Sequence, residues 1–313
     1  MGKNVLLIAG GGTLGTYTAE ELLRLGHRVE VICLEEKTSN DENLCFYQGR
    51  ADAAFLEQFL QDKKYDGIVN FIHYPHAEEY PAVHQILMAH TDHLIVLSSY
   101  RVYADAQHPI TEEAPMLLDT ATDQTFLETE KYALSKAKLE RYLQAECKGQ
   151  NWTVVRPVIS FSSLRLDLVT YSGHMLLEKA RNGETIPLPV EAKDRTAGLD
   201  WAGNSGKLIA NLLFKQECIG QAYTVSSAQN LTWGQLAELY SELIGAKFAW
   251  VPLEAYCEAM GNGDLYWLIY DRLFDRKIDN SKICKATGLK ETDFVPIKEG
   301  LKRELTKIKE QML

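Results

Sequence analysis

The chain has 313 residues, of which 46% are hydrophobic and 24% are charged, as in ordinary globular proteins. Its apolar runs are shorter than the ~20 residues of a membrane span, and a formal net charge of −10 disfavours nucleic acid as a partner. The six cysteines contain no Cys-x-x-Cys pair and the first residues carry no signal-peptide pattern, so we expect a cytoplasmic protein with reduced thiols and no membrane attachment.

Short apolar runs alternate with longer amphipathic runs in the first half of the chain. Strands are predicted at residues 5–9, 29–33, 44–48, 67–72 and 93–97. Helices are predicted at residues 14–25, 53–61, 78–89 and 126–143. Apolar strands alternating with helices are typical of a parallel sheet that is covered on both faces. The pattern predicts an α/β fold with a doubly wound Rossmann sheet.

The second half of the chain is less regular. Strands are predicted at residues 153–156, 222–226 and 248–251, and helices at 201–214, 232–244 and 297–309. We expect a dinucleotide-binding Rossmann domain over residues 1–157 and a smaller C-terminal substrate-binding lobe over residues 158–313. Residues from about 198 to 225 are expected to return to the Rossmann domain. A small-molecule site would lie in the cleft between the two parts.

A glycine-rich loop follows the first predicted strand and opens the first helix. Gly10, Gly12 and Gly15 fit the spacing Gly-x-Gly-x-x-Gly. Such glycines permit a sharp turn, close approach of a pyrophosphate and tight helix–strand packing. The amides at the helix start, including those of Thr13 and Leu14, would face the phosphates. The loop predicts dinucleotide binding, with a purely structural turn as the alternative.

The end of the second predicted strand is the usual place for an acid that binds the adenosine ribose. Glu35 and Glu36 stand just beyond this end. A carboxylate there would accept from ribose hydroxyls and repel a 2′-phosphate, which predicts NAD and leaves NADP open. The alternative is that both glutamates are solvated loop charges. Arg50 would be the first candidate to bind a 2′-phosphate.

Tyr132 and Lys136 lie four residues apart in a predicted helix and therefore share one face. Leu139 and Leu143 continue the stripe, so this face is expected to point inward. A nearby ammonium makes a phenol easier to ionise, which suits a tyrosine that exchanges a proton with a substrate oxygen. An amphipathic surface helix is the alternative.

Ser98 and Ser99 follow the strand predicted at residues 93–97. A hydroxyl at the carboxyl end of a parallel strand lies at the cleft, where it can bind a reacting oxygen. Capping of the next turn is the alternative role for both serines.

The order of these motifs resembles the extended short-chain dehydrogenase/reductases, which include the NAD-dependent sugar epimerases and dehydratases. The resemblance spans nearly the whole chain. It is carried by Ser98-Ser99-x-x-Val102-Tyr103, Tyr132-Ala133-Leu134-Ser135-Lys136-x-x-x-Glu140, Val154-Val155-Arg156-Pro157, Asp200-Trp201-Ala202 and Asp279-Asn280-Ser281-Lys282.

The resemblance implies a catalytic triad of Ser99, Tyr132 as general acid/base, and Lys136 as the residue that activates Tyr132 and holds the nicotinamide ribose. Backbone around Pro157 would border the nicotinamide. The implied enzyme is an NAD(P)-dependent epimerase/dehydratase or reductase that acts on a hydroxyl or carbonyl carbon. A nucleotide sugar is the candidate substrate and a homodimer the candidate assembly.

Four departures from the family pattern concern mainly the adenosine half. The first glycine of the family's Gly-x-x-Gly-x-x-Gly falls on Ala9, the ribose acid on Cys33 and the adenine acid on Gly49. The usual small residues after the fourth strand are replaced by His73-Tyr74-Pro75-His76. These departures leave a second hypothesis open, namely a non-catalytic dinucleotide-binding protein that serves regulation or RNA binding. A subgroup of relatives binds chloroplast RNA, and residues 49–52 resemble that subgroup.

The histidines suggest a metal site only weakly. His73 and His76 are close in sequence, whereas His84 and His90 follow at a distance. Polar loop residues that line the cofactor cleft are the preferred interpretation, and no metal is expected.

Overall fold

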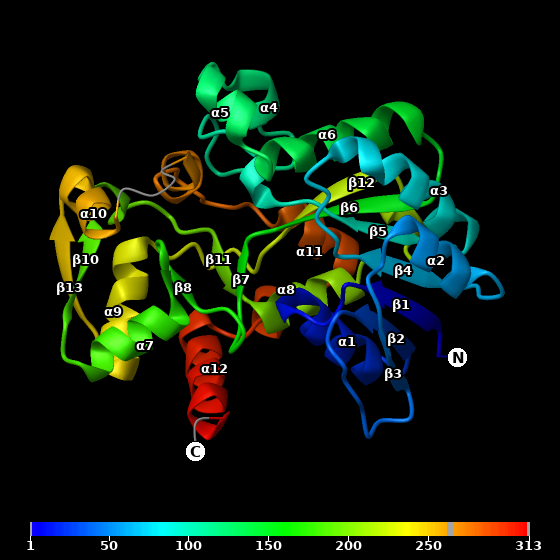
Figure 1. Ribbon diagram of the computed structural model, residues 1–313, viewed down its shortest axis with the longest axis horizontal. Helices are drawn as coiled ribbons and strands as arrows, with labels where there is room; N and C mark the ends of the chain where they lie inside the picture. Colours follow the sequence, from blue (N-terminus) through cyan, green and yellow to red (C-terminus); the bar gives the residue numbers. More distant parts are fainter. Residues whose placement is uncertain (1, 262–265, 312–313) are drawn as a thin grey trace.

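A seven-stranded sheet forms the centre of the computed structural model, which describes residues 2–261 and 266–311 (Figure 1). The strand order is β12-β6-β5-β4-β1-β2-β3, and all neighbours pair in parallel. The strands are β1 (Asn4–Ile8), β2 (Arg28–Cys33), β3 (Leu44–Gln48), β4 (Gly67–Asn70), β5 (Leu94–Leu97), β6 (Trp152–Pro157) and β12 (Gln221–Val225). This parallel sheet confirms the predicted Rossmann-type α/β fold.

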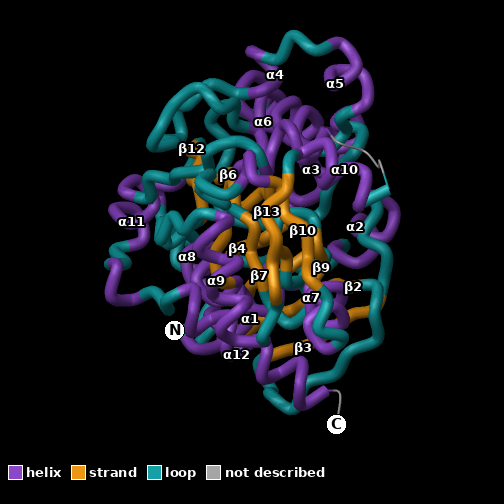
Figure 2. The backbone as a smooth tube through the Cα atoms, turned by 90° about the vertical axis from the view of Figure 1, so that its left-hand side faces the viewer, coloured by secondary structure: helices purple, strands orange, loops and turns teal. Residues whose placement is uncertain are grey.

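Helices cover both faces of the sheet, which explains why its strands are apolar throughout. In β1, Val5 and Leu7 belong to one hydrophobic core, whereas Leu6 and Ile8 belong to the core on the opposite face. One face packs against α1 (Thr13–Arg24), α8 (Ala202–Ala210) and α11 (Ser281–Thr287). The other face packs against α2 (Ala53–Leu60), α3 (Tyr80–Ala89) and α6 (Ala133–Glu146). Figure 2 shows the strands between these two layers.

The remaining elements form a second lobe, on the left of Figure 1. Its strands are the parallel pair β10 (Thr185–Pro189) and β13 (Lys247–Val251), together with the short antiparallel pair β8 (Asp167–Leu168) and β9 (Tyr171–Ser172). Its helices are α7 (Gly173–Arg181), α9 (Trp233–Ile244), α10 (Leu253–Ala259) and α12 (Ile297–Gln311). A further pair, β7 (Ile159–Phe161) and β11 (Leu199–Trp201), lies where the chain passes between the lobes. After β11, α8 packs along α1 and β12 joins the edge of the main sheet.

One predicted helix is divided in the structure. The helix expected at residues 126–143 consists of α5 (Gln124–Thr129) and α6, separated at residues 130–132. The Glu130 carboxylate accepts hydrogen bonds from the amides of Tyr132 and Ala133, at 2.5 and 2.8 Å, and this contact starts α6 anew. The short helix α4 (Leu117–Thr120) precedes this region.

No helix in the part of the chain that the structure describes is both long and apolar enough to cross a membrane.

Candidate active site

The glycine loop between β1 and α1 needs glycine for packing at two of the three positions of the Gly-x-Gly-x-x-Gly motif. A Cβ atom on Gly15 would lie 2.2 Å from the Gly10 carbonyl oxygen, and one on Gly10 would lie 2.8 Å from the Leu7 Cβ. A Cβ on Gly12 would instead point into open space, with no atom within 4 Å among the described residues. The loop is therefore tightly packed on the protein side and open on the side where a ligand would approach.

Ala9 has a backbone angle φ of 54°, in the left-handed region that favours glycine. This position corresponds to the first glycine of the family pattern. The alanine therefore holds its conformation at a cost, which the surrounding turn must offset.

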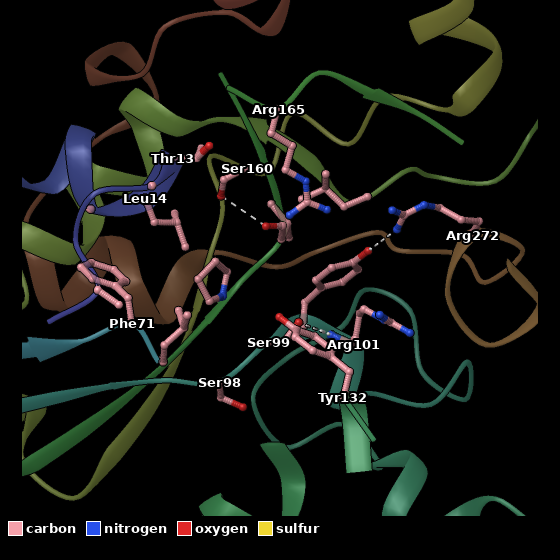
Figure 3. A pocket seen from close by; sticks show the side chains of 18 residues that line it. Thr13, Leu14, Phe71, Ser98, Ser99, Arg101, Tyr132, Ser160, Arg165 and Arg272 are labelled. Atoms are coloured by element: carbon pink, nitrogen blue, oxygen red, sulfur yellow. Dashed lines mark hydrogen bonds between the residues drawn. The ribbon is translucent and has the colours of Figure 1, made fainter. Parts of the chain in front are cut away.

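A cavity of about 450 Å³ lies at the carboxyl ends of β1, β5 and β6 (Figure 3). Its lining includes Gly12, Thr13, Leu14 and Gly15 from the loop, Ser99 and Tyr132 from the motifs, and Pro157 from the end of β6. In Figure 3 Ser99 and Tyr132 lie on one side of this cavity, which we call the catalytic cavity because these two residues of the predicted triad line it. Arg165 enters from the opposite side, and Arg272 enters beside Tyr100, with which it forms a hydrogen bond. Gly10 and Lys136 are buried outside the lining.

Ser99 follows β5 and is 4% exposed. Its Oγ accepts a hydrogen bond from the Arg101 amide at 3.2 Å, which caps the short turn after β5. This bond uses a lone pair and leaves the hydroxyl proton free for a ligand. The capping role considered from the sequence therefore exists and is compatible with a second role in the cavity.

Tyr132 is the N-cap residue that immediately precedes α6, and it is half-buried. The centre of its ring lies 4.8 Å from the centre of the His73 ring and 5.0 Å from the Arg101 guanidinium carbon. These contacts hold the ring between an imidazole and a cation.

Lys136 is one turn further along α6 and is 1% exposed. Its Nζ donates hydrogen bonds to the carbonyl oxygens of Ile72, at 3.2 Å, and Leu97, at 2.5 Å. Burial lowers the pKa of Lys136 to about 7, although the charge of Glu140 acts in the opposite direction. Because an ammonium has three donors, one N–H beyond these two bonds is available to a ligand.

A second cavity, of about 770 Å³, adjoins the first at Ala9 and Gly12. Both Glu35 and Arg50 line it, as do Cys33 and Gly49. The buried Cys33 thiol donates a hydrogen bond to the Glu35 carbonyl oxygen at 3.2 Å. This adenosine-side cavity therefore contains the residues that the sequence singled out beyond β2.

Packing explains why position 49 holds glycine and not the adenine acid of the family pattern. A Cβ on Gly49 would lie 2.4 Å from the ring of Phe55, which therefore occupies the space of any larger side chain. An acid cannot stand at this position unless Phe55 moves.

Lys37, in the segment after β2, contacts the glycine loop, and the sequence did not predict this contact. Its Nζ donates a hydrogen bond to the Gly11 carbonyl oxygen at 2.6 Å and so fastens the segment after β2 to the glycine loop. No motif marks Lys37, because its position depends on how residues 34–43 fold back.

The four histidines lie in separate surroundings. His73 lines the adenosine-side cavity, where burial and the charges of Lys136 and Arg101 lower its pKa to about 4. His76 is exposed, His84 bonds to Tyr80 and Gln150, and His90 bonds to the Lys63 carbonyl. Within residues 2–261 and 266–311, no group of three His, Cys, Asp or Glu side chains is placed to hold a metal ion.

Three arginines line the catalytic cavity, namely Arg101, Arg165 and Arg272. Arg272 stands near Arg276 and Lys277 in the sequence, and no motif marks Arg101 or Arg165. Arg165 lies in an irregular segment, so no periodic signal could have found it. Arg101 stands two residues after Ser99, which places it beside the cavity.

The sequence of residues 6–189 matches the profile of the NAD-dependent epimerase/dehydratase family. No curated protein matches the sequence. Three solved structures illustrate the similarity of fold. The epimerase Mth375 from Methanothermobacter thermautotrophicus has a TM-score of 0.73 at 16% identity, covering 99% of this chain and 93% of that chain. WbmH from Bordetella bronchiseptica in complex with NAD+ has a TM-score of 0.70 at 17% identity, covering 99% of both chains. A UDP-glucose 4-epimerase from Thermotoga maritima with UDP-glucose has a TM-score of 0.70 at 16% identity, covering 99% of this chain and 100% of that chain.

Proposed function

Because the chain belongs to the NAD-dependent epimerase/dehydratase family, we propose that it is an NAD-dependent epimerase or reductase that acts on a hydroxyl-bearing carbon of a nucleotide sugar. The observation that carries this proposal is the catalytic cavity, which Ser99, Tyr132 and the glycine loop line together.

The residues present fit NAD. The open side of Gly12 and the start of α1 at Thr13 and Leu14 offer amides to a pyrophosphate. Ala9 and Gly12 line both cavities, so one dinucleotide can span them. Glu35 would accept from the adenosine ribose, and the third N–H of Lys136 would hold the nicotinamide ribose. Bound NAD supplies a hydride acceptor, and its reduced form a hydride donor.

Side chains of the protein then transfer the proton and bind the substrate oxygen. The Tyr132 phenol passes a proton to or from the substrate oxygen. Ser99 donates its hydroxyl proton to the same oxygen while it still accepts from the Arg101 amide. Pro157, at the end of β6, lines the cavity and helps to exclude water from the nicotinamide side.

The lining of the catalytic cavity favours oxidation and reduction over elimination of water. Elimination needs one group that removes a carbon-bound proton and another that protonates the departing hydroxyl. Among the described lining residues there is no Asp, Glu or His. Tyr132 can serve the single proton transfer of a hydride reaction, which supports an epimerase or reductase rather than a dehydratase.

Two arginines support a nucleotide sugar as the substrate. Arg165 lies across the cavity from Tyr132 (Figure 3), Arg272 lines the cavity beside Tyr100, and a diphosphate needs only one or two cations. Arg165 also lines a neighbouring cavity of about 900 Å³ beside α7, which offers room for a nucleoside.

The test begins with mass measurement of the cofactor that purifies with the protein. The protein is then supplied with NAD and a panel of nucleotide sugars, and products are resolved by nuclear magnetic resonance. Conversion of at least one nucleotide sugar, lost in Ser99→Ala and Tyr132→Phe, is the expected result. Tight NAD binding without conversion or binding of any nucleotide sugar would overturn the proposal in favour of a non-catalytic dinucleotide-binding protein.

A further inference from the structure

Three guanidinium groups surround one buried carboxylate next to the catalytic cavity. Asp271 is 1% exposed, forms an ion pair with Arg272, and lies 3.5 Å from Arg276 Nε and 3.6 Å from Arg101 Nε. The Tyr100 hydroxyl donates to the same carboxylate at 2.7 Å. One carboxylate therefore serves three cations and a phenol.

The charges of this cluster do not balance. Glu130 is the second acid in contact with it, through Arg101 Nη2 at 3.4 Å. Asp167 is a third acid, which acts on Arg272 and forms an ion pair with Arg165. With this pair included, four cations against three anions leave one positive charge beside the cavity. Because burial of an unpaired charge is costly, an anionic ligand that completes the cluster would be bound favourably.

Arg101 is the member of the cluster that meets the reacting end of the cavity. Its guanidinium lies over the Tyr132 ring, and its amide bonds to Ser99. Its Nε is buried and has no hydrogen-bond partner within the described parts of the chain. Its contacts with Glu130 and Asp271, at 3.4 and 3.6 Å, exceed the length of about 2.7–2.9 Å that is typical of charge-assisted hydrogen bonds.

Both acids near Arg101 already interact with other groups. Glu130 accepts from the amides of Tyr132 and Ala133 at the start of α6. Asp271 is engaged by Arg272 and the Tyr100 hydroxyl. Arg101 therefore retains hydrogen-bonding capacity for a ligand.

From this geometry we infer that the sugar bound in the catalytic cavity carries a carboxylate and that Arg101 binds it. The inference rests on the proposed function and specifies its substrate class as a nucleotide-linked sugar acid. Arg165 enters the cavity from the opposite side and is the first candidate to bind the diphosphate, whereas Arg101 contacts Tyr132 and Ser99 and is left for a second anionic group near the reacting hydroxyl. A carboxylate carries one negative charge, which matches the single excess positive charge of the cluster.

The test compares two probes that differ at one group of the sugar. Calorimetric titration of the NAD-loaded protein measures the affinities for UDP-glucuronate and UDP-glucose. We expect UDP-glucuronate to bind at least about tenfold more tightly, as one charge-assisted hydrogen-bonded contact implies. Arg101→Met should abolish this preference while it leaves the affinity for UDP-glucose within about threefold. Arg101→Lys should retain part of the preference, since it keeps the charge and loses the planar fork.

The control variant is Arg141→Met, because Arg141 is an exposed arginine on α6 that pairs with Asp119. It should leave both affinities unchanged. Circular dichroism and NAD affinity establish that each variant is folded. If Arg101→Met does not fold, the affinities of the unaltered protein for UDP-glucuronate and UDP-glucose test the inference.

Two outcomes would separate the inference from the proposal beneath it. Equal affinities for the two probes, or equal weakening of both by Arg101→Met, would overturn the inference and leave a nucleotide-sugar enzyme. Absence of binding by both probes to protein that binds NAD would overturn the proposed function and the inference with it.

Discussion

Tyr132 reaches the catalytic cavity because Glu130 ends one helix and starts the next, which places Tyr132 at the N-cap of α6. We predict that Tyr132→Phe lowers turnover by about 10²–10⁴-fold, the usual contribution of a general acid/base. NAD affinity should remain, because the glycine loop lies on another side of the cavity. Single-turnover kinetics and NAD titration measure the two effects, with Tyr142→Phe on the same helix as the control. A near-normal rate of Tyr132→Phe would show that Tyr132 does not transfer the proton.

His93 is a buried titratable residue at the start of β5 that serves stability. Its Nδ1 accepts from the Phe214 amide at 3.0 Å, so Nε2 carries the proton and donates to Thr153 Oγ1 at 2.8 Å. Burial lowers the pKa of His93 to about 4. Because the folded state favours the neutral ring, its stabilising contribution is complete above the unfolded pKa of about 6.5 and is lost as pH falls toward 4.

The predicted loss from His93 is on the order of 3 kcal/mol of unfolding free energy between pH 6.5 and 4. Denaturant unfolding at several pH values measures it. His93→Gln should be less stable at pH 7 but should change less over this range. His76→Gln, at an exposed position, should retain the full pH dependence. Identical pH profiles for His93→Gln and the unaltered protein would contradict this assignment.

At the residue scale, the sequence predicted the lining residues whose positions follow from strand ends. Ser99 and Pro157 belong to this group, because the carboxyl ends of β5 and β6 meet at one edge of the sheet. Arg165 and Lys37 were missed, since each reaches its place through irregular backbone. Phe55 was missed because its ring fills the space at Gly49 only after α2 has packed.

The glycine loop contains a residue with a strained backbone conformation. Ala9 occupies a left-handed conformation with φ of 54°. We predict that Ala9→Gly raises the unfolding free energy by roughly 0.5–1 kcal/mol, because relief of the Cβ strain exceeds the entropy cost of glycine. NAD affinity should be unchanged or higher. Ala82→Gly, at an exposed position within α3, should instead destabilise by about 1 kcal/mol. Destabilisation by both glycines would show that the turn does not strain Ala9.

Helix α12 fixes the segment next to the catalytic cavity through one buried acid. The Glu304 carboxylate accepts from Tyr17 Oη, from Trp201 Nε1 at 2.8 Å and from the Ser163 amide at 2.8 Å. Burial acts to raise the pKa of Glu304, but hydrogen bonds from these three residues outweigh it and hold the pKa below its usual range. The adjacent Ser162 bonds to Thr13 of the glycine loop, with the two hydroxyl oxygens 2.9 Å apart.

Removal of this carboxylate should therefore affect both stability and the site. We predict that Glu304→Ala lowers the unfolding free energy by roughly 3–5 kcal/mol, because it leaves the donors of Tyr17, Trp201 and Ser163 without their acceptor. It should also raise KM more than it lowers kcat, because residues 162–165 carry Arg165 into the cavity. Glu299→Ala, which removes an exposed partner of Arg303 on the same helix, should cost less than about 0.5 kcal/mol. Equal effects of the two substitutions would rule out the anchoring role of Glu304.

Element boundaries were predictable where one physical signal dominated. The apolar strands β1, β2 and β5 coincide with their predicted runs to within one or two residues, because both faces of each strand are covered. The break between α5 and α6 was missed because the hydrophobic period continues across it, while the Glu130 contact decides the boundary. The short strands β8 and β9 were missed because two residues are too few to produce a periodic signal.

At the scale of the whole molecule, charge and burial argue against nucleic acid as a ligand. The net charge is −10. Arg272, Arg276 and Lys277 lie close together in the sequence and would be candidates for a basic surface. Arg272 and Arg276 are 5% and 1% exposed and are engaged by Asp271, so only Lys277 of the three stands at the surface. The arginines therefore serve the interior and the catalytic cavity rather than an RNA-binding face.

We predict no RNA binding of consequence at physiological salt. A protein that binds RNA through its phosphates needs several exposed cations on one surface. Its affinity falls steeply with salt, because added salt reduces the free energy gained when counterions leave the RNA. Fluorescence polarisation of a labelled single-stranded RNA at low and at physiological salt measures this affinity, alongside the panel of nucleotide sugars. Weak binding at low salt that disappears at physiological salt is compatible with the prediction, since a few surface lysines suffice for it. Micromolar binding that persists at physiological salt, with no response to any nucleotide sugar, would instead establish an RNA-binding protein in which the Rossmann fold and its departures at Ala9, Cys33 and Gly49 serve recognition without turnover.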